Sequence, residues 1–290
     1  MKKLLALFLG GLLFIGSMGN VLAEGDEGPF ATGNFSATLT MTTDYVFRGI
    51  SFSGEDPAIQ GSFDWAYGNF FAGIWGSSIK GEAFGTSGDG FESEFDYYVG
   101  YSNSFAGFDW YVMPIYYNFP GASDSLGELA FAGRSTSELE TDQFEVWVEV
   151  SRAVDTLPLS PTFTLFYSYS PDFTLEDGSG NYIRGSVALS LPAGFGLDGG
   201  VGYQDVEGDD ATGSSGAFCD PAIGSVTSIA GGSLCDGYSY THWDIGLTNS
   251  LVGFDFDLRY HDTDDDKATA AFYGSDNIDA RLVFTVSRSF

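Results

Sequence analysis

The chain has 290 residues and a formal net charge of −29, with 40 acidic residues against 11 lysines and arginines. So acidic a chain offers no basic patch to neutralise phosphate, which argues against nucleic-acid binding. Aromatic residues make up 17% of the chain and 40 residues are glycine. This composition favours a membrane β-barrel with aromatic girdles and curved strands over a soluble β-sandwich.

The first residues have the pattern of a secretory signal peptide. Two lysines precede an apolar run over residues 4–16, and Val21-Leu22-Ala23 forms a small-x-small cleavage site. The run is shorter than the ~20 residues of a spanning helix, which argues against a membrane anchor. We expect a signal peptide over 1–23, a short periplasmic segment over 24–34, and a mature chain that crosses a membrane only with strands.

Segments of alternating polarity follow along the chain, separated by turn-rich stretches. The predicted strands are 35–48, 57–67, 69–79, 93–102, 108–117, 141–152, 161–170, 181–191, 195–204, 239–248, 254–261 and 277–290. Short and long connections alternate between them, with short turns expected on the periplasmic side. The predicted fold class is all-β: a transmembrane antiparallel up-and-down β-barrel of about 12 strands over residues 35–290.

One parity of each predicted strand is apolar and is expected to face lipid. The outward set includes Tyr45, Phe47, Trp65, Phe144, Ile245, Ile278 and Phe284. Two segments, 70–75 and 110–117, are apolar on both faces, and Pro114 predicts a bulge or local distortion in the second. The terminal Phe290 resembles the signal read by the outer-membrane assembly machinery. We therefore expect a location in the outer membrane of a Gram-negative bacterium, with lipid and that machinery as partners.

The opposite parity is expected to line the lumen. Its charged members and one histidine are the pore-lining candidates Asp44, Arg48, Asp64, Glu94, Asp96, Glu145, Glu149, Arg184, Asp198, His242, Asp244, Asp255, Asp257, Arg259, Asp279 and Arg281. Carboxylates outnumber arginines in this set. Twelve strands give a backbone diameter of roughly 24 Å, so we expect a narrow pore for small solutes that favours cations or zwitterions.

The long connections carry two further expectations. Cys219 and Cys235 lie in one polar, glycine-rich segment, and an exported chain meets an oxidising periplasm, so we predict a structural disulfide. Acidic runs in the connections near 176–181, 206–210 and 261–267 are usually solvated loops, and they leave open a weak Ca²⁺ site. We expect no cofactor and no resident metal.

Several motifs resemble the TorF-type porin family. They are Thr43-Asp44-Tyr45-Val46-Phe47-Arg48-Gly49-Ile50-Ser51, Pro57-Ala58-Ile59-Gln60-Gly61-Ser62-Phe63-Asp64, Phe71-Ala72-Gly73-Ile74-Trp75-Gly76-Ser77, Tyr97-Tyr98-Val99-Gly100-Tyr101, Tyr169-Ser170-Pro171-Asp172 and the ending Asp279-Ala280-Arg281-Leu282-Val283-Phe284. The resemblance implies an outer-membrane barrel and supplies no catalytic residue.

The first of these motifs allows two interpretations of Arg48. It ends the first predicted strand and points inward near Asp44 and Asp64, either as the anchor of a lumen ion pair or as part of a selectivity ring. Gly49 and Gly54 are expected to form a tight outer turn.

Two other functions stay open. The charges could form a salt-bridge network that plugs the barrel, which would then act as a surface receptor or adhesin. An outer-membrane hydrolase is a weaker alternative. His242 has Asp244 on its own face and Thr241 beside it, but no nucleophile motif accompanies them. We therefore expect a channel and not an enzyme.

Overall fold

The computed structural model describes residues 28–81, 92–122, 141–173, 178–207, 237–264 and 275–290. Twelve strands form its main sheet: β1 (Phe35–Thr42), β4 (Ala58–Tyr67), β5 (Phe70–Ser78), β6 (Ser93–Phe105), β7 (Phe108–Asn118), β8 (Gln143–Ala153), β9 (Thr162–Ser170), β10 (Gly180–Ser190), β11 (Phe195–Val206), β12 (Tyr238–Leu251), β13 (Phe254–Thr263) and β14 (Arg281–Ser289).

The sheet closes on itself. Strands adjacent in the chain pair antiparallel, and β1 pairs with both β4 and β14. Thr38 of β1, for example, faces Ser289 on one side and Ser62 on the other. Closure matters because it satisfies every ladder group without an exposed edge. The predicted twelve-stranded antiparallel barrel is confirmed.

The outer surface of the barrel is apolar. Along β9, Phe163, Leu165, Tyr167 and Tyr169 are exposed while the alternate residues are buried. The same holds on the other strands, where Val99, Val201 and Ile245 are about half exposed. A surface of large hydrophobic side chains around a closed barrel is the surface that lipid covers. Among the described residues, no helix is long and apolar enough to cross a membrane.

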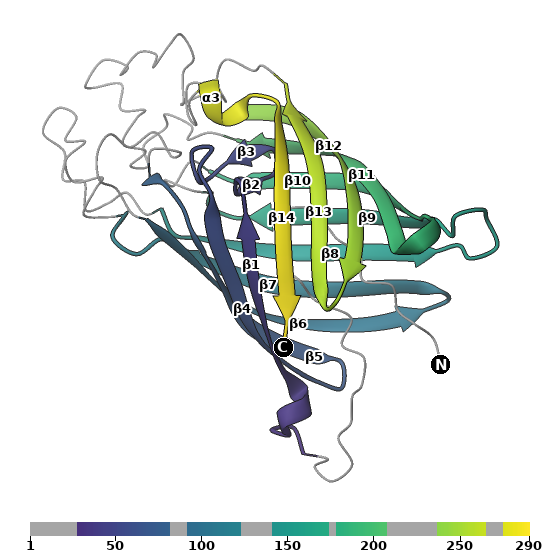
Figure 1. Ribbon diagram of the computed structural model, residues 1–290. Helices are drawn as coiled ribbons and strands as arrows, with labels where there is room; N and C mark the ends of the chain where they lie inside the picture. The colour runs from purple at the N-terminus through teal and green to yellow at the C-terminus, as the bar shows by residue number, and fades with distance from the viewer. Residues whose placement is uncertain (1–27, 82–91, 123–140, 174–177, 208–236, 265–274) are drawn as a thin grey trace, which may run out of the picture.

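The connections differ in length between the two ends of the barrel. At one end lie the connections 68–69, 106–107, 154–161, 191–194 (with the 3-10 helix η5, Pro192–Gly194) and 252–253, together with the C-terminus (Figure 1). At the other end lie the longer connections, including the helix α3 (Ser275–Ile278). We call these the short-turn end and the long-loop end. The 3-10 helix η1 (Thr32–Asn34) precedes β1.

The sequence analysis placed three residues on the wrong face of the barrel. Tyr45, Phe47 and Ile278 were expected on the outer surface, but all three are buried inside the barrel. They lie outside the twelve strands, because β1 ends at Thr42 and β14 begins only at Arg281, so the strand parity does not extend to them.

The expectation of a bulge or local distortion at Pro114 is confirmed as a local distortion without a bulge. The register between β6 and β7 is the same at Phe95–Asn118 and at Phe105–Phe108, so no residue is inserted between them. The ladder is interrupted at Met113 and Pro114, which is the local distortion expected of a residue without an N–H.

Aromatic side chains fill much of the interior at the long-loop end. The inward residues of this kind include Trp75, Tyr98, Tyr117, Trp147, Phe166 and Tyr182. These residues lie on the six consecutive strands β5 to β10. On β5 and β7 they make both faces apolar, which is why the sequence did not show which face points inward. The lumen is therefore lined by both aromatic and charged side chains. The aromatic side chains form an apolar surface against which another segment of the chain can pack.

Candidate functional site: a hairpin across the lumen

The connection between β1 and β4, residues 43–57, folds into the barrel. Within it β2 (Val46–Phe47) and β3 (Ile50–Ser51) form a short hairpin, with Phe47 facing Ile50. Figure 1 shows it at the long-loop end, and all residues from 44 to 53 are buried. The tight outer turn expected at Gly49 and Gly54 is confirmed at Gly54, where Gly54 and Glu55 have φ angles of +61° and +64° and the Asp56 N–H donates to the Ser53 carbonyl at 3.3 Å. It is wrong at Gly49, which is buried and turns inward. The hairpin turns inward because its apolar side chains find an aromatic interior to pack against.

Arg48 and Gly49 form the two-residue turn at the tip of this hairpin. Their φ angles are +49° and +85°, as a tight hairpin of the I′ type requires. A Cβ on Gly49 would lie 2.4 Å from Oγ1 of Thr263 and 2.6 Å from Cβ of His242. Thr263 also donates its hydroxyl to the Gly49 carbonyl at 2.8 Å. The tip is therefore seated directly on β12 and β13.

The Arg48 guanidinium joins the tip to the opposite wall. It donates to both carboxylate oxygens of Glu145, at 3.0 and 2.6 Å. It also donates to Oε1 of Gln204 and Oγ of Ser168, each at 2.8 Å. The partners come from β8, β11 and β9, and both charged side chains are almost fully buried. Bidentate, charge-assisted bonds of this kind fix orientation as well as distance.

Aromatic rings complete the surroundings of Arg48. Its Cζ lies 4.6 Å from the ring centroid of Phe47 and 4.4 Å from that of Tyr182, within cation–π range. Burial opposes the charged form, but Glu145 outweighs it and the pKa of the Arg48 guanidinium is raised. The side chain therefore stays charged in a largely aromatic setting.

The base of the hairpin is held by Asp44. Its carboxylate accepts hydrogen bonds from Ser51 and Ser53, at 2.6 and 2.7 Å, and from Arg281 of β14 at 2.8 Å. Nearer the membrane edge, Asp56 forms an ion pair with Lys80. Both ends of the hairpin are thus fixed by ionic contacts.

These contacts correct the expected neighbours of Arg48. It was predicted near Asp44 and Asp64, but Asp44 pairs with Arg281, and Asp64 accepts from Tyr98 and from Ser62 at 2.7 Å. The error has one cause: β1 stops at Thr42, so the chain carries Arg48 away from Asp44 at the base of the hairpin and from Asp64 on β4.

A second ionic cluster lies on the inner wall formed by β10 to β13. Arg184 contacts Asp244 at 2.5 Å, and Arg259 contacts Asp198, Asp244 and Asp257 at 2.8, 2.5 and 2.8 Å. Glycines make the space for these side chains. A Cβ on Gly200 would lie 2.7 Å from Cζ of Arg184, and one on Gly246 would lie 2.6 Å from Cζ of Arg259.

Strands β6 and β8, across the lumen from this cluster, carry three further carboxyl groups that have no arginine partner in the described part of the chain. Glu94 and Asp96 of β6 are buried, and Tyr45 donates its hydroxyl to Oε1 of Glu94 at 3.4 Å. Burial and the nearby Glu94 and Asp96 raise the pKa of the Tyr45 phenol well above its ordinary value, so it remains a donor. Glu149 of β8 is half-buried beside Tyr111.

The remaining predicted residues lie toward the ends of the barrel. Asp255 accepts from Ser250 at 2.5 Å next to the β12–β13 turn. Asp279 is exposed ahead of β14 and is not on the inner wall, because α3 occupies this part of the chain. Phe290 is exposed, and its backbone pairs with Ala37 of β1.

Some expectations concern residues that the structure does not describe. Cys219 and Cys235 lie outside the described residues, as do most of the acidic runs expected to be able to bind Ca²⁺. Within the described part of the chain, no group of three or more His, Cys, Asp or Glu side chains could hold a metal ion.

His242, the residue considered for hydrolysis, has a structural neighbour instead of a nucleophile. Its Nε2 lies 2.9 Å from the Tyr182 hydroxyl, and the two rings stack. Thr241 falls on the opposite face of β12. The hydroxyl that contacts His242 therefore belongs to Tyr182 and not to Thr241.

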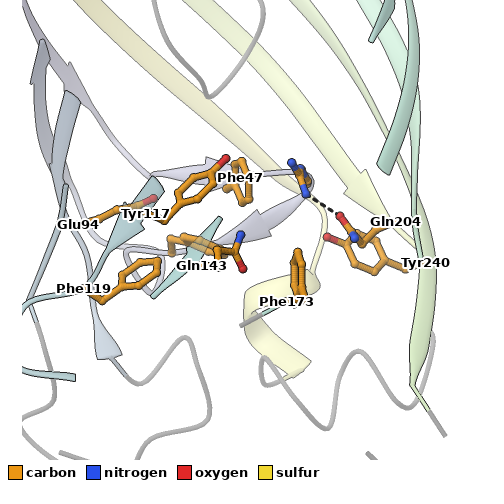
Figure 2. A pocket seen from close by; sticks show the side chains of 10 residues that line it. Phe47, Glu94, Tyr117, Phe119, Gln143, Phe173, Gln204 and Tyr240 are labelled. Atoms are coloured by element: carbon orange, nitrogen blue, oxygen red, sulfur yellow. Dashed lines mark hydrogen bonds between the residues drawn. The ribbon is translucent and has the colours of Figure 1, made fainter. Parts of the chain in front are cut away.

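The hairpin leaves little free space beside Arg48. The cavity beside Arg48 measures about 10 Å³, room for about one water molecule. Figure 2 shows Glu94 and Tyr117 on one side of it and Gln204 and Tyr240 on the other. Toward the short-turn end, inward residues such as Ser36, Thr38 and Ser186 are half-exposed. The lumen is therefore occupied mainly where the hairpin crosses it.

Sequence reasoning missed the hairpin and the residues that receive it. Ser168, Tyr182 and Gln204 carry no motif of their own. One local signal was present: a two-residue Arg48-Gly49 segment between the apolar Phe47 and Ile50, which is the spacing of a tight hairpin.

Fold and site together define a transmembrane β-barrel with an inward hairpin latched across its lumen. The chain belongs to the Gcw_chp family, described as a bacterial protein of unknown function, which matches residues 24–235. This match does not test the TorF-type resemblance. No curated protein matches the chain.

Solved structures of other barrels are similar over most of their length. The KdgM porin is 7% identical with a TM-score of 0.49, covering 88% of this chain and 99% of its own. The NanC porin is 10% identical with a TM-score of 0.47, covering 88% and 98%. LpxR from Salmonella typhimurium is 11% identical with a TM-score of 0.43, covering 88% and 99%. Similarities this distant assign no function.

Proposed function

We propose that the protein is a narrow outer-membrane channel for small solutes, constricted by the hairpin of residues 43–57. The observation that carries the proposal is the hairpin itself, which crosses a charged lumen and is latched to the far wall through Arg48 and Glu145. Short turns face the periplasm and long loops face outward, as in bacterial barrels. The TorF-type porin resemblance points the same way.

The balance of charge favours cations or zwitterions. In the described part of the chain, each inward arginine already has a carboxylate partner. Asp64, Glu94, Asp96 and Glu149 have no arginine within ion-pair distance in that same part. With the hairpin lifted, a passing solute meets these uncompensated carboxyl groups, which concentrate cations and repel anions.

Passage requires the hairpin to shift. With the hairpin seated, the space beside Arg48 admits about one water molecule. The hairpin is a short segment with its own turn, and it is held by side chains at base and tip. It can therefore leave its seat without breaking the ladder of the barrel. The structure corresponds to the closed state of the proposed channel.

A plugged barrel that acts as a surface receptor is the second candidate. The fully buried Arg48–Glu145 pair and the aromatic packing around it favour this alternative, because a permanent seal would use the same contacts. The two candidates predict different permeation of solutes through the barrel.

Solute swelling of proteoliposomes separates these candidates. The full-length protein is reconstituted and exposed to cationic, zwitterionic, neutral and anionic solutes of matched size, with protein-free vesicles as control. We expect faster swelling in the cationic and zwitterionic solutes than in the anionic one. Swelling equal to that of protein-free vesicles in every solute would favour the plugged receptor. Equal rates for anions and cations would reject the proposed selectivity.

A further inference from the structure

We propose that Glu94 and Asp96 form a proton-binding site beneath the hairpin and carry one shared proton while the hairpin is seated. The site belongs to the wall strand β6 and is covered by the segment that leads into β2. The inference deepens the proposed function, since the hairpin is its moving part. It is tested by a measurement that needs no conduction.

The two carboxyl groups are buried, and among the described residues only one of their four oxygens, Oε1 of Glu94, has a donor. Glu94 is 1% exposed and Asp96 is 0% exposed. Oε2 of Glu94 and both Oδ atoms of Asp96 have no hydrogen-bond partner among the described residues. The two side chains lie two residues apart on the same, inward face of β6, close enough for each to affect the charge of the other. Orphaned acceptors in such numbers are rare in folded proteins and need a specific explanation.

Among the described residues, no cation compensates the pair. Tyr45 approaches from the hairpin side, Trp75 lies across from Asp96 on β5, and Tyr117 lies across from it on β7. The adjacent Tyr98 donates to Asp64, so it is engaged elsewhere.

The charged groups nearest the pair do not relieve it either. Glu145 of β8 adds a further negative charge. Arg48 lines the same small cavity as Glu94 but donates to Glu145, Gln204 and Ser168. Among the described neighbours named here, those that contact the pair are therefore aromatic, hydroxylic or acidic.

Two adjacent carboxylates in such a place cannot both be ionised. Burial penalises each charge, and each charge raises the cost of the other. A single proton resolves both problems, because a protonated carboxyl becomes a donor to its neighbour and halves the charge. A bound metal ion is less suited, since the described residues offer no third acidic or imidazole ligand here.

The hairpin makes the site and is coupled to it. Tyr45 donates to Glu94, and its ring packs against Trp75 at 5.4 Å and Phe52 at 5.5 Å between centroids. Lifting the hairpin removes this cover and admits water, which stabilises both carboxylates and releases the proton. The seated state thus binds one more proton than the lifted state. Its stability is complete at low pH and decreases as pH rises through the titration of the pair.

Infrared spectroscopy of the full-length protein in lipid vesicles at neutral pH tests the site. A protonated carboxyl shows a C=O stretch, separate from that of a carboxylate, that shifts in D₂O. We expect this band in the wild type and its loss in Asp96→Asn and in Glu94→Gln. Asp64→Asn is the matched control and should retain the band, because Asp64 accepts bonds from Tyr98 and Ser62. Replacing residues 46–51 with a Gly-Ser linker should also abolish the band.

Three results would overturn the proposal. One is the absence of the band in the wild type. Another is a wild-type carboxylate band that changes when Na⁺ is replaced by choline, which would show a bound metal cation. The third is a band that survives in both Asp96→Asn and Glu94→Gln. If the band is lost in both point variants but survives in the linker variant, the proposed coupling between the proton site and the hairpin is wrong. Heat-modified mobility on gels identifies folded barrels, and two substitutions at different residues guard against one that fails to fold.

Discussion

Arg48 and Glu145, 97 residues apart in the sequence, meet inside the barrel through two hydrogen bonds of 3.0 and 2.6 Å. One side chain belongs to a connecting segment and the other to the inner wall. The pair is therefore intact only while the connecting segment lies against the inner wall of the barrel.

Breaking this pair should unseat the hairpin. Arg48→Ala leaves Glu145 buried and unpaired, and removing one partner of a buried pair costs about 3–5 kcal/mol. We expect that loss in the free energy of unfolding, measured by urea in lipid vesicles. The double variant Arg48→Met, Glu145→Met should recover much of it, since no unpaired charge remains. Arg152→Ala, at an exposed position on β8, is the control and should differ little from wild type.

The inward glycines should be intolerant of even one methyl group. Gly246→Ala places Cβ 2.6 Å from Cζ of Arg259, so the arginine and its carboxylate partners must move. We expect a loss of about 1–3 kcal/mol in unfolding free energy, as for other overpacked interiors. Gly185→Ala, where the same methyl group meets nothing within 4 Å, should be neutral or slightly stabilising. Equal effects at the two positions would contradict the packing described for this wall.

The outer face should behave as a lipid-facing surface. Leu258→Arg places a charge among exposed apolar side chains midway along β13, and we expect a loss of about 2–4 kcal/mol in vesicles. Val252→Arg, in the β12–β13 turn, should cost only about 0–1 kcal/mol because the turn lies near the interface. The two variants are compared by urea unfolding in the same lipid. A smaller cost at Leu258 than at Val252 would be incompatible with this orientation in the membrane.

Phe290 should matter for assembly more than for the folded barrel. Its ring is 70% exposed, and only its backbone joins β1. Replacing Phe290 with Ser should lower the yield of inserted barrel in cells while leaving refolding into detergent unchanged. Pulse–chase heat modification measures the first and gel mobility the second. A refolding defect as large as the cellular one would assign the residue a structural role.

Most of the twelve wall strands could be predicted because their alternation is local. On β9 one parity is apolar throughout, on β12 the same holds from Trp243 to Leu247, and the structure places both sets outside. Strands β5 and β7 resisted because the interior is partly aromatic, so both of their faces are apolar. Only the assembled barrel distinguishes an inward Trp75 from an outward Ile74.

The hairpin could not be found from periodicity. Tyr45 and Phe47 continue the parity of the preceding strand, so nothing in the alternation shows that β1 stops at Thr42. The hairpin seat is assembled from Glu145, Ser168 and Gln204 on three separate strands. No local pattern in one sequence brings those residues together.

Single-channel recording in planar bilayers tests the hairpin constriction most directly. The wild type is compared with the variant in which residues 46–51 are replaced by a Gly-Ser linker, with Arg152→Ala as a folded control. We predict small, cation-favouring steps for the wild type and Arg152→Ala, and steps of several-fold larger conductance for the linker variant. Silent bilayers with both the wild type and the linker variant, or identical conductance in the two, would contradict a channel narrowed by this hairpin.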